Sequence, residues 1–261
     1  MLMFVIALAL TVTVILIAGE VRQYIRENQA NLSLAESVRA QREATAQTWR
    51  ASGEASSQET DAEQGTILPW YEALYNSNND MAGWLYIDGT NIDYPVMYTP
   101  RQQDYYLHLA FNGDYAASGS LFIAVPWESD GRHTIIYGHH MRDGSMFGQL
   151  NRYADASYGR EHAVIHFDTL TQEGEYELVA AFYSQVYDEA DGDWAFRYYD
   201  YPALSTEEEF AYYVRQVRAA ALYDTGIEPV WGDTLLTLST CNYHTEDGRF
   251  VVVARKITQE G

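Results

Sequence analysis

The sequence contains a single cysteine, Cys241, which ends the segment TLSTC, and Arg249 follows it after a short polar loop. One cysteine cannot form a disulfide within its own chain, so a structural cross-link is excluded. A thiol becomes a nucleophile when it ionises, and a neighbouring guanidinium stabilises the thiolate. The usual alternative for a free cysteine is a small buried hydrophobic residue. Because Cys241 adjoins a polar loop, the sequence favours nucleophilic catalysis over that structural role.

Strand periodicity places this cysteine at the end of a strand. In DTLLTLSTC the side chains alternate between two faces, so Ser239 and Cys241 share one face and Thr240 points to the other. The next apolar segment, FVVVARK, begins directly after Arg249. If the two segments pair as antiparallel strands, Cys241 and Arg249 lie side by side at the same open end.

Histidine is the side chain best suited to exchange a proton with such a site near neutral pH. The chain has seven histidines, His108, His133, His139, His140, His162, His166 and His244. In TIIYGHHMRDG a predicted strand ends at Gly138, which places His139 at a strand exit. His244 is close to Cys241 in sequence and remains an alternative base. No carboxylate or second cysteine stands at ligand spacing around the histidine pair, so we expect no metal site.

From residue 67 onward the chain consists of short apolar segments separated by Gly, Asn, Asp and Pro. This pattern is typical of a fold with many short strands. We predict strands at Gly83–Ile87, Tyr94–Met97, Ser120–Ile123, Thr134–Tyr137, Ala163–Phe167, Tyr176–Tyr187, Thr234–Thr240 and Phe250–Lys256. The clearest helix begins at Ser205, where STEEEF supplies a capping serine with Glu208 three residues on. The fold class is therefore mainly β, and a closed barrel with helices at its ends and in one connection is favoured.

The first eighteen residues, MLMFVIALALTVTVILIA, carry no charge and are long enough to cross a bilayer as a helix. We predict a transmembrane anchor at residues 1–18. A cleaved signal peptide is the alternative, although LIAGE is a poor cleavage site. Arg22 and Arg26 follow this run and no basic residue precedes it. Because positively charged flanks usually lie in the cytoplasm, this pattern would place the rest of the chain inside the cell. A short basic leader upstream of the given start would reverse that orientation.

Residues 19–66 are rich in Glu, Gln, Arg, Ala and Ser, and they cannot bury enough apolar surface to form a core. Good helix formers dominate as far as Trp49, whereas ASGEASSQETDAEQG is typical of a flexible linker. The apolar positions Leu32, Leu34 and Val38 do not sustain a heptad. We therefore predict a polar helical stalk and linker that serve as a spacer.

The charge balance excludes one class of partner. The 261 residues include 37 Asp and Glu against 16 Lys and Arg, which gives a formal net charge of −21. A protein this acidic is repelled by phosphate backbones, so we expect no nucleic-acid binding. Hydrophobic residues make up 47% of the chain, enough to fill the core of one large domain or two modest ones.

Several of these motifs together resemble the sortases, and specifically the class B sortases of Gram-positive cell surfaces. The resemblance spans roughly residues 67 to 257 in the family's order. It is carried by TLSTC with its arginine, by IIYGHHMRDGSMFG, and by AGWLYIDGTNIDYPVM, DYYLHLAFNGDYAASGSLF, ALYDTGI and DGRFVVVARK.

The resemblance implies an eight-stranded sortase β-barrel with N-terminal helices and an extra helix between strands 6 and 7, which residues 205–222 match. The catalytic domain would span residues 67–261. The implied activity is that of a cysteine transpeptidase without a cofactor. It would cleave a C-terminal sorting signal of a secreted protein after Thr and join the protein to an amine of the cell wall precursor or of a pilin. A peptidase that hydrolyses instead, or an inactive binding module, is the alternative.

Position by position, the resemblance implies that Cys241 is the nucleophile, His139 the catalytic histidine and Arg249 the catalytic arginine. Thr240 matches the residue that helps to stabilise the oxyanion, and we add Ser239 to this oxyanion and substrate-binding set.

Two positions depart from the family pattern, since His140 stands where an asparagine is usual and Ala124 where an acidic or amide residue is usual. Substrates and wall both lie outside the cell. We therefore expect the missing basic leader, a single membrane pass through the N-terminal helix and an extracellular catalytic domain.

Overall fold

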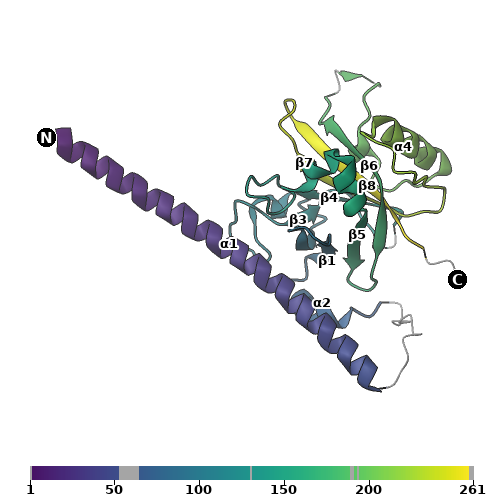
Figure 1. Ribbon diagram of the computed structural model, residues 1–261, viewed down its shortest axis with the longest axis horizontal. Coiled ribbons are helices and arrows are strands. Elements are labelled where there is room, and N and C mark those ends of the chain that lie inside the picture. Colours follow the sequence, from purple (N-terminus) through teal and green to yellow (C-terminus); the bar gives the residue numbers. More distant parts are fainter. Residues whose placement is uncertain (1, 53–64, 130, 189–190, 193, 259–261) are drawn as a thin grey trace.

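The computed structural model of the protein describes residues 2–52, 65–129, 131–188, 191–192 and 194–258. Most of the predicted flexible linker, residues 51–65, lies outside the described residues. The described part consists of a β-barrel with a long helix packed along one side, and that helix continues well beyond the barrel toward the N terminus (Figure 1).

Within the described residues eight strands close into a ring in the order β1-β2-β3-β4-β7-β8-β6-β5. The strands are β1 (Met81–Tyr86), β2 (Asp93–Tyr98), β3 (Leu121–Ile123), β4 (His133–Gly138), β5 (Val164–Thr169), β6 (Glu175–Gln185), β7 (Leu235–Cys241) and β8 (Gly248–Lys256). Each strand overlaps one of the predicted strands, so the expected eight-stranded barrel is confirmed. Most neighbours pair antiparallel, but β2 with β3 and β4 with β7 are parallel.

Helices lie at the N-terminal side and in the connections. They are α1 (Leu2–Ser52), α2 (Pro69–Ser77), α3 (Ala156–Glu161) and α4 (Glu207–Ala220), with 3-10 turns η1 (Tyr105–His108), η2 (Leu150–Ala154) and η4 (Tyr198–Asp200). Helix α4 lies between β6 and β7, as expected. Its N-cap is Thr206, whose hydroxyl accepts from the Glu209 backbone N–H, so the predicted cap at Ser205 was one residue early.

Strands β4, β7 and β8 are covered on both faces, which explains their nearly continuous apolar sequences. The inward side chains fill the barrel, and they include Leu236, Leu238, Phe250 and Val252. The outward side chains pack under α4 and the rest of the β6–β7 connection, and this second cluster includes Ile135, Leu235, Val251, Phe210, Tyr213 and Val217. The β6–β7 connection, with α4 in it, therefore covers the outer face of these strands, and we call it the lid.

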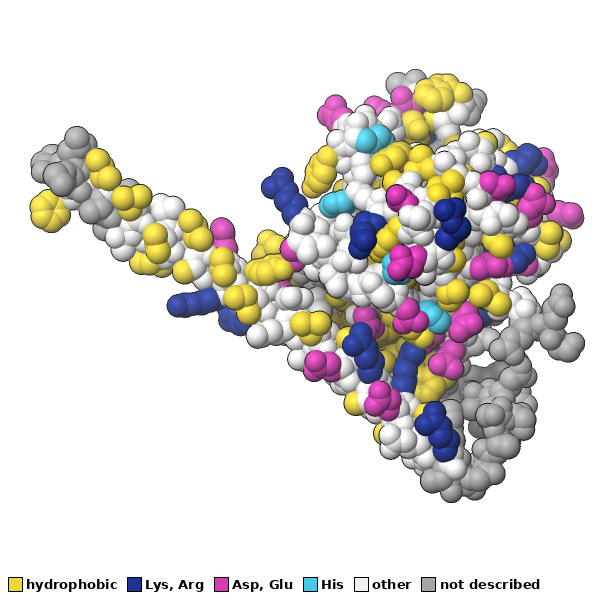
Figure 2. All heavy atoms as spheres, viewed as in Figure 1, with side chains coloured by type: hydrophobic (Ala, Val, Ile, Leu, Met, Phe, Trp, Pro, Cys, Tyr) yellow, Lys and Arg dark blue, Asp and Glu magenta, His cyan; other side chains and the backbone are white. Residues whose placement is uncertain are grey.

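Helix α1 does more than the predicted spacer. Ala35 and Val38 are buried, at 4% and 2% exposure, in a third cluster with α2, β1 and β2. Apolar side chains nearer the N terminus project from the part of the helix beyond the barrel (Figure 2). Among the residues that the structure describes, no helix combines the length and apolarity needed to cross a membrane. The anchor expected at residues 1–18, several of whose side chains lie outside the description, is thus not confirmed.

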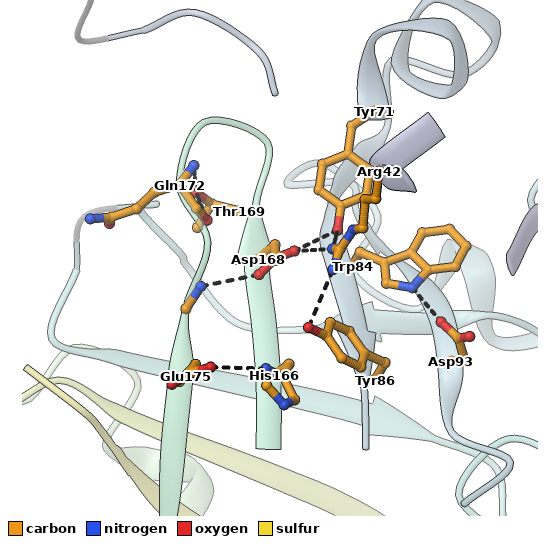
Figure 3. A network of polar contacts seen from close by, with 11 residues as sticks. Arg42, Tyr71, Trp84, Tyr86, Asp93, His166, Asp168, Thr169, Gln172 and Glu175 are labelled. Atoms are coloured by element: carbon orange, nitrogen blue, oxygen red, sulfur yellow. Dashed lines mark hydrogen bonds and ion pairs between the residues drawn. The ribbon is translucent and has the colours of Figure 1, made fainter. Parts of the chain in front are cut away.

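A buried polar network fastens α1 to the barrel (Figure 3). Arg42 forms an ion pair with Asp168, whose side chain is 2% exposed. The Tyr71 hydroxyl accepts from Arg42 and donates to Asp168 at 2.7 Å, and Arg42 donates to the Tyr86 hydroxyl at 3.2 Å. The Gly174 backbone N–H also donates to Asp168, at 3.0 Å. Burial raises the pKa of the Asp168 carboxyl, and Arg42 opposes that shift, so the carboxylate needs its partner.

A second buried network fastens the lid. His133 faces the Tyr201 carbonyl through Nδ1 at 2.7 Å and the Thr237 hydroxyl through Nε2 at 2.8 Å. Because a carbonyl only accepts, Nδ1 carries the hydrogen and Nε2 accepts from Thr237. The Tyr213 hydroxyl completes the group at 2.8 Å from that of Thr237. Burial lowers the pKa of His133 from 6.5 to about 4, although the Tyr201 carbonyl opposes the shift.

Replacing Arg42 with Met should leave Asp168 buried without its cation and should lower the free energy of unfolding by about 3 kcal/mol. The matched control is Arg39→Met. Arg39 is 66% exposed where it pairs with Asp93, so its loss should cost less than about 1 kcal/mol. Urea denaturation followed by tryptophan fluorescence measures both. Equal losses from the two variants would show that the Arg42 network does not hold the helix.

His133 should also make the stability depend on pH. The unfolded histidine takes up its proton near pH 6.5 and the folded one near pH 4. Its stabilising contribution is therefore complete above pH 6.5 and is lost as the pH falls toward 4, by up to about 3 kcal/mol. We expect His133→Gln to flatten the curve of unfolding free energy against pH over this window, with the partly exposed His162→Gln as control. Parallel curves for wild type and His133→Gln would contradict this.

Candidate active site

Cys241 and Arg249 are direct partners across two antiparallel strands. Cys241 is the last residue of β7, and the register of β7 on β8 pairs it with Arg249. Both residues are partly exposed. The Arg249 guanidinium donates to the backbone carbonyls of Asp247 at 3.2 Å and Gly248 at 3.0 Å, which keeps it on the turn between β7 and β8. The predicted strand-end pairing is confirmed.

His139 reaches the same rim from the other side of β7. Strands β4 and β7 run parallel, and their last registered pair is Gly138 with Thr240. The residue after Gly138 is His139, and the residue after Thr240 is Cys241. The backbones of His139 and Cys241 therefore lie side by side at the ends of adjacent strands. The Thr240 hydroxyl donates to the Gly138 carbonyl at 2.8 Å and fastens the two strand ends together.

The His139 ring is half-buried between the strand end and the η1 turn. Its Nε2 lies 2.8 Å from the Leu107 carbonyl oxygen, and its ring stacks on that of His108 with centroids 5.3 Å apart. The pKa of His139 is lowered overall, chiefly by burial and also by the nearby His108, while the hydrogen bond to Leu107 opposes the shift. Since the carbonyl only accepts, Nε2 carries a hydrogen and Nδ1 is the nitrogen that titrates.

His140, the neighbour of His139, and His244, the alternative base, each make other hydrogen bonds. His140 forms a β-bridge with Met146, and its Nδ1 accepts from the Asn151 amide at 3.0 Å. Its ring also hydrogen-bonds to the backbone of Cys241. Burial lowers the pKa of the His140 imidazole, and the bond to Cys241 opposes that shift. His244 is exposed, and its Nδ1 donates to Asn242 at 2.8 Å. His139 directly follows the registered pair of Gly138 with Thr240, whereas the hydrogen bond to the Cys241 backbone comes from His140, so the choice of His139 as the catalytic histidine stays a prediction.

The two residues predicted to take part in oxyanion or substrate binding, Ser239 and Thr240, are both buried. Ser239 is 1% exposed and Thr240 is 2% exposed. The Ser239 hydroxyl lies 2.7 Å from the hydroxyl of Tyr198, which belongs to the lid. The Thr240 hydroxyl donates its hydrogen bond to the Gly138 carbonyl. In this structure the two side chains therefore tie β7 to its surroundings, and the roles expected for them in oxyanion or substrate binding stay predictions.

Sequence reasoning missed Tyr198 and the η1 turn as parts of this rim. Burial raises the pKa of Tyr198 to about 12, and among the smaller influences Arg249 lowers it and Cys241 raises it. Tyr198 is therefore within electrostatic reach of both. The turn carrying Leu107 and His108 falls inside the segment DYYLHLAFNGDYAASGSLF, but nothing in its residue types predicts a contact with His139.

Comparison with known proteins agrees with this architecture. A sequence model of the sortase domain matches residues 85–257. The chain is 30% identical to sortase B of Listeria monocytogenes over 199 residues, which cover 75% of this chain and 77% of that protein. Two solved structures are similar at 26% identity. Sortase B from B. anthracis in complex with AAEK1 superposes with a TM-score of 0.71 and covers 91% of this chain and 99% of its own. A sortase B complexed with triglycine superposes with a TM-score of 0.65, covering 76% and 90%.

The domain match spans most of the barrel and includes Cys241, His139 and Arg249. Together with the identity to the Listeria protein and the superposition on sortase B structures, it shows that this chain belongs to the sortase family and, within it, to the class B sortases.

Proposed function

We propose that this sortase is a cysteine transpeptidase in which Cys241 is the nucleophile, His139 the proton carrier and Arg249 the electrostatic stabiliser. The observation that carries the proposal is the convergence of the three at one rim. One strand register pairs Cys241 with Arg249, and the other ends at the pair of Gly138 with Thr240, one residue before His139 and Cys241. The three come from separate segments of the chain, and a purely structural cysteine would not require this arrangement.

The first half-reaction consumes the sorting signal. The Cys241 thiolate attacks the carbonyl carbon of a threonine, and the carbonyl oxygen becomes an oxyanion beside the positive charge of Arg249. Collapse of this intermediate breaks the C–N bond. The His139 imidazolium gives its proton to the departing amine, and the threonyl carbonyl stays on sulfur as a thioester.

The second half-reaction regenerates the enzyme. An acceptor amine attacks the thioester carbon and loses a proton to the neutral His139, a new amide forms, and Cys241 leaves as the thiolate. One histidine must therefore give and take a proton in turn. Burial and His108 favour its neutral form, whereas the Leu107 carbonyl favours the cation. The net shift of the His139 pKa is downward, which favours the neutral form that takes the proton from the acceptor amine, and the imidazolium of the first half-reaction is the less populated form.

The substrates follow from the same proposal. The donor is a secreted protein with a C-terminal sorting signal, and the acceptor is an amine of the cell wall precursor or of a pilin. A related sortase B has been solved with triglycine, a peptide whose free amino group is of the proposed acceptor class. The uncharged run at residues 1–18 supports a single membrane pass. The proposed position of the catalytic domain outside the cell rests on where these substrates lie.

Incubation with a panel of sorting-signal peptides should add the mass of the threonyl fragment to Cys241, as seen by mass spectrometry of the intact chain. Adding triglycine should remove the adduct and produce a ligated peptide. The matched control is Cys241→Ala, which should form neither. Turnover by that variant would eliminate the mechanism, whereas release of free acid at a rate that triglycine does not change would identify a hydrolase.

Arg249→Met should slow acylation of Cys241 by about a hundredfold to a thousandfold, because the oxyanion loses its cationic partner. Arg249→Lys should recover only part of the rate, since an ammonium lacks the planar set of donors of a guanidinium. Arg218→Met, which removes an arginine from an exposed pair with Glu228, is the control and should acylate normally. Single-turnover acylation kinetics distinguish the three. A normal rate for Arg249→Met would exclude the assigned role.

A further inference from the structure

The η1 turn makes two contacts with His139 that the mechanism above does not use. One is the hydrogen bond from His139 Nε2 to the Leu107 carbonyl, at 2.8 Å. The other is the ring of His108, which lies at an interplanar angle of 20° to the imidazole of His139. A hydrogen bond fixes one ring atom, and a stacked ring opposes rotation of the whole imidazole. The two contacts together define its orientation.

The turn is itself held in place. The His108 carbonyl accepts from the Ala116 backbone N–H at 3.0 Å, which ties the turn to the segment before β3. Gly119 has a φ of +58°, and a Cβ there would come within 2.3 Å of the Leu107 carbonyl oxygen. Only glycine permits that approach. The carbonyl that accepts from His139 is therefore packed directly on the backbone of Gly119.

Orientation matters for this histidine because its two nitrogens have different tasks. Nε2 donates to Leu107, so Nδ1 is the atom that gains and loses the proton. The χ2 torsion of histidine is broad, and a single hydrogen bond leaves the ring free to tilt. Misplacement of a proton carrier by about 1 Å is sufficient to slow a reaction substantially.

We propose that His108 is a positioning residue for His139, whose stacked ring keeps the imidazole with Nε2 on Leu107 and Nδ1 available to the groups that react at Cys241. This inference rests on the proposed function, since it assigns His108 a task in the same proton transfers. His108 is exposed and acts through His139.

The electrostatic surroundings give a second signature. The charged group that acts on His139 is His108 from η1. His140 is its neighbour in sequence, and the strand registers bring Cys241 from β7 and Arg249 from β8 to the same end of the sheet. Removing the His108 ring uncovers the imidazole and removes a like charge. Since burial and His108 both lower the pKa of His139, both changes raise it.

The test compares His108→Ala, which removes the ring, with His108→Phe, which keeps a stacked ring without charge. Tyr105→Ala changes an exposed residue of the same turn and is the control. We expect His108→Ala to lower kcat for transpeptidation about tenfold with little change in KM, and His108→Phe to restore most of it. The His139 imidazole, followed by NMR in chains that also carry Cys241→Ala, should titrate about 0.5 to 1 unit higher in His108→Ala.

An unchanged kcat and an unchanged titration of His139 in His108→Ala would overturn the inference. Equal losses in His108→Ala and His108→Phe would also overturn it, since they would assign the effect to the charge of His108 rather than to its ring. So would an equal loss in Tyr105→Ala, which would indicate a loosened turn. If the unmodified chain acylates no peptide, the proposed function fails, and the NMR titration still decides whether His108 holds His139.

Discussion

The site depends on the register of one strand, β7, between two others that run in different directions relative to it. Its antiparallel pairing with β8 fixes Cys241 opposite Arg249, and its parallel pairing with β4 fixes Gly138 opposite Thr240. A slip of one residue in either pairing would turn the affected side chains to the opposite face. Backbone hydrogen bonding between strands therefore sets the position of the thiol relative to the arginine and the histidine. The reacting side chains themselves need not hold the strands in register.

Burial on both faces is what makes that register secure. The inward side chains of β7 fill the barrel, and its outward side chains are covered by the lid. Polar contacts then fix the lid along the strand at two points, where Thr237 meets His133 and Tyr213 and where Ser239 meets Tyr198. A buried hydroxyl without a hydrogen-bond partner would lower the stability of the fold. These contacts therefore favour one position of the lid on the strand that carries the nucleophile.

Helix α1 extends this support to the other side of the rim. Beyond its fastening through Arg42, it contacts both chain segments that flank His139. Tyr24 donates to Asp143 in the loop after β4, and Ser118, after η1, donates to Glu27 at 3.1 Å. The N-terminal helix is therefore part of the structure that supports the chain segments around His139.

The sequence by itself determined the strands, the helix between β6 and β7, and the pairing of Cys241 with Arg249, because alternation and a short loop are local signals. It also indicated the family through several separate motifs. Only the tertiary structure decided that α1 packs on the barrel through Arg42 and Asp168, that Ser239 is buried against Tyr198, and that His108 stacks on His139. These contacts join residues far apart in the chain or orient a side chain across a loop. The closure of the barrel determines which residues meet in these contacts, and no periodic pattern in the sequence predicts them.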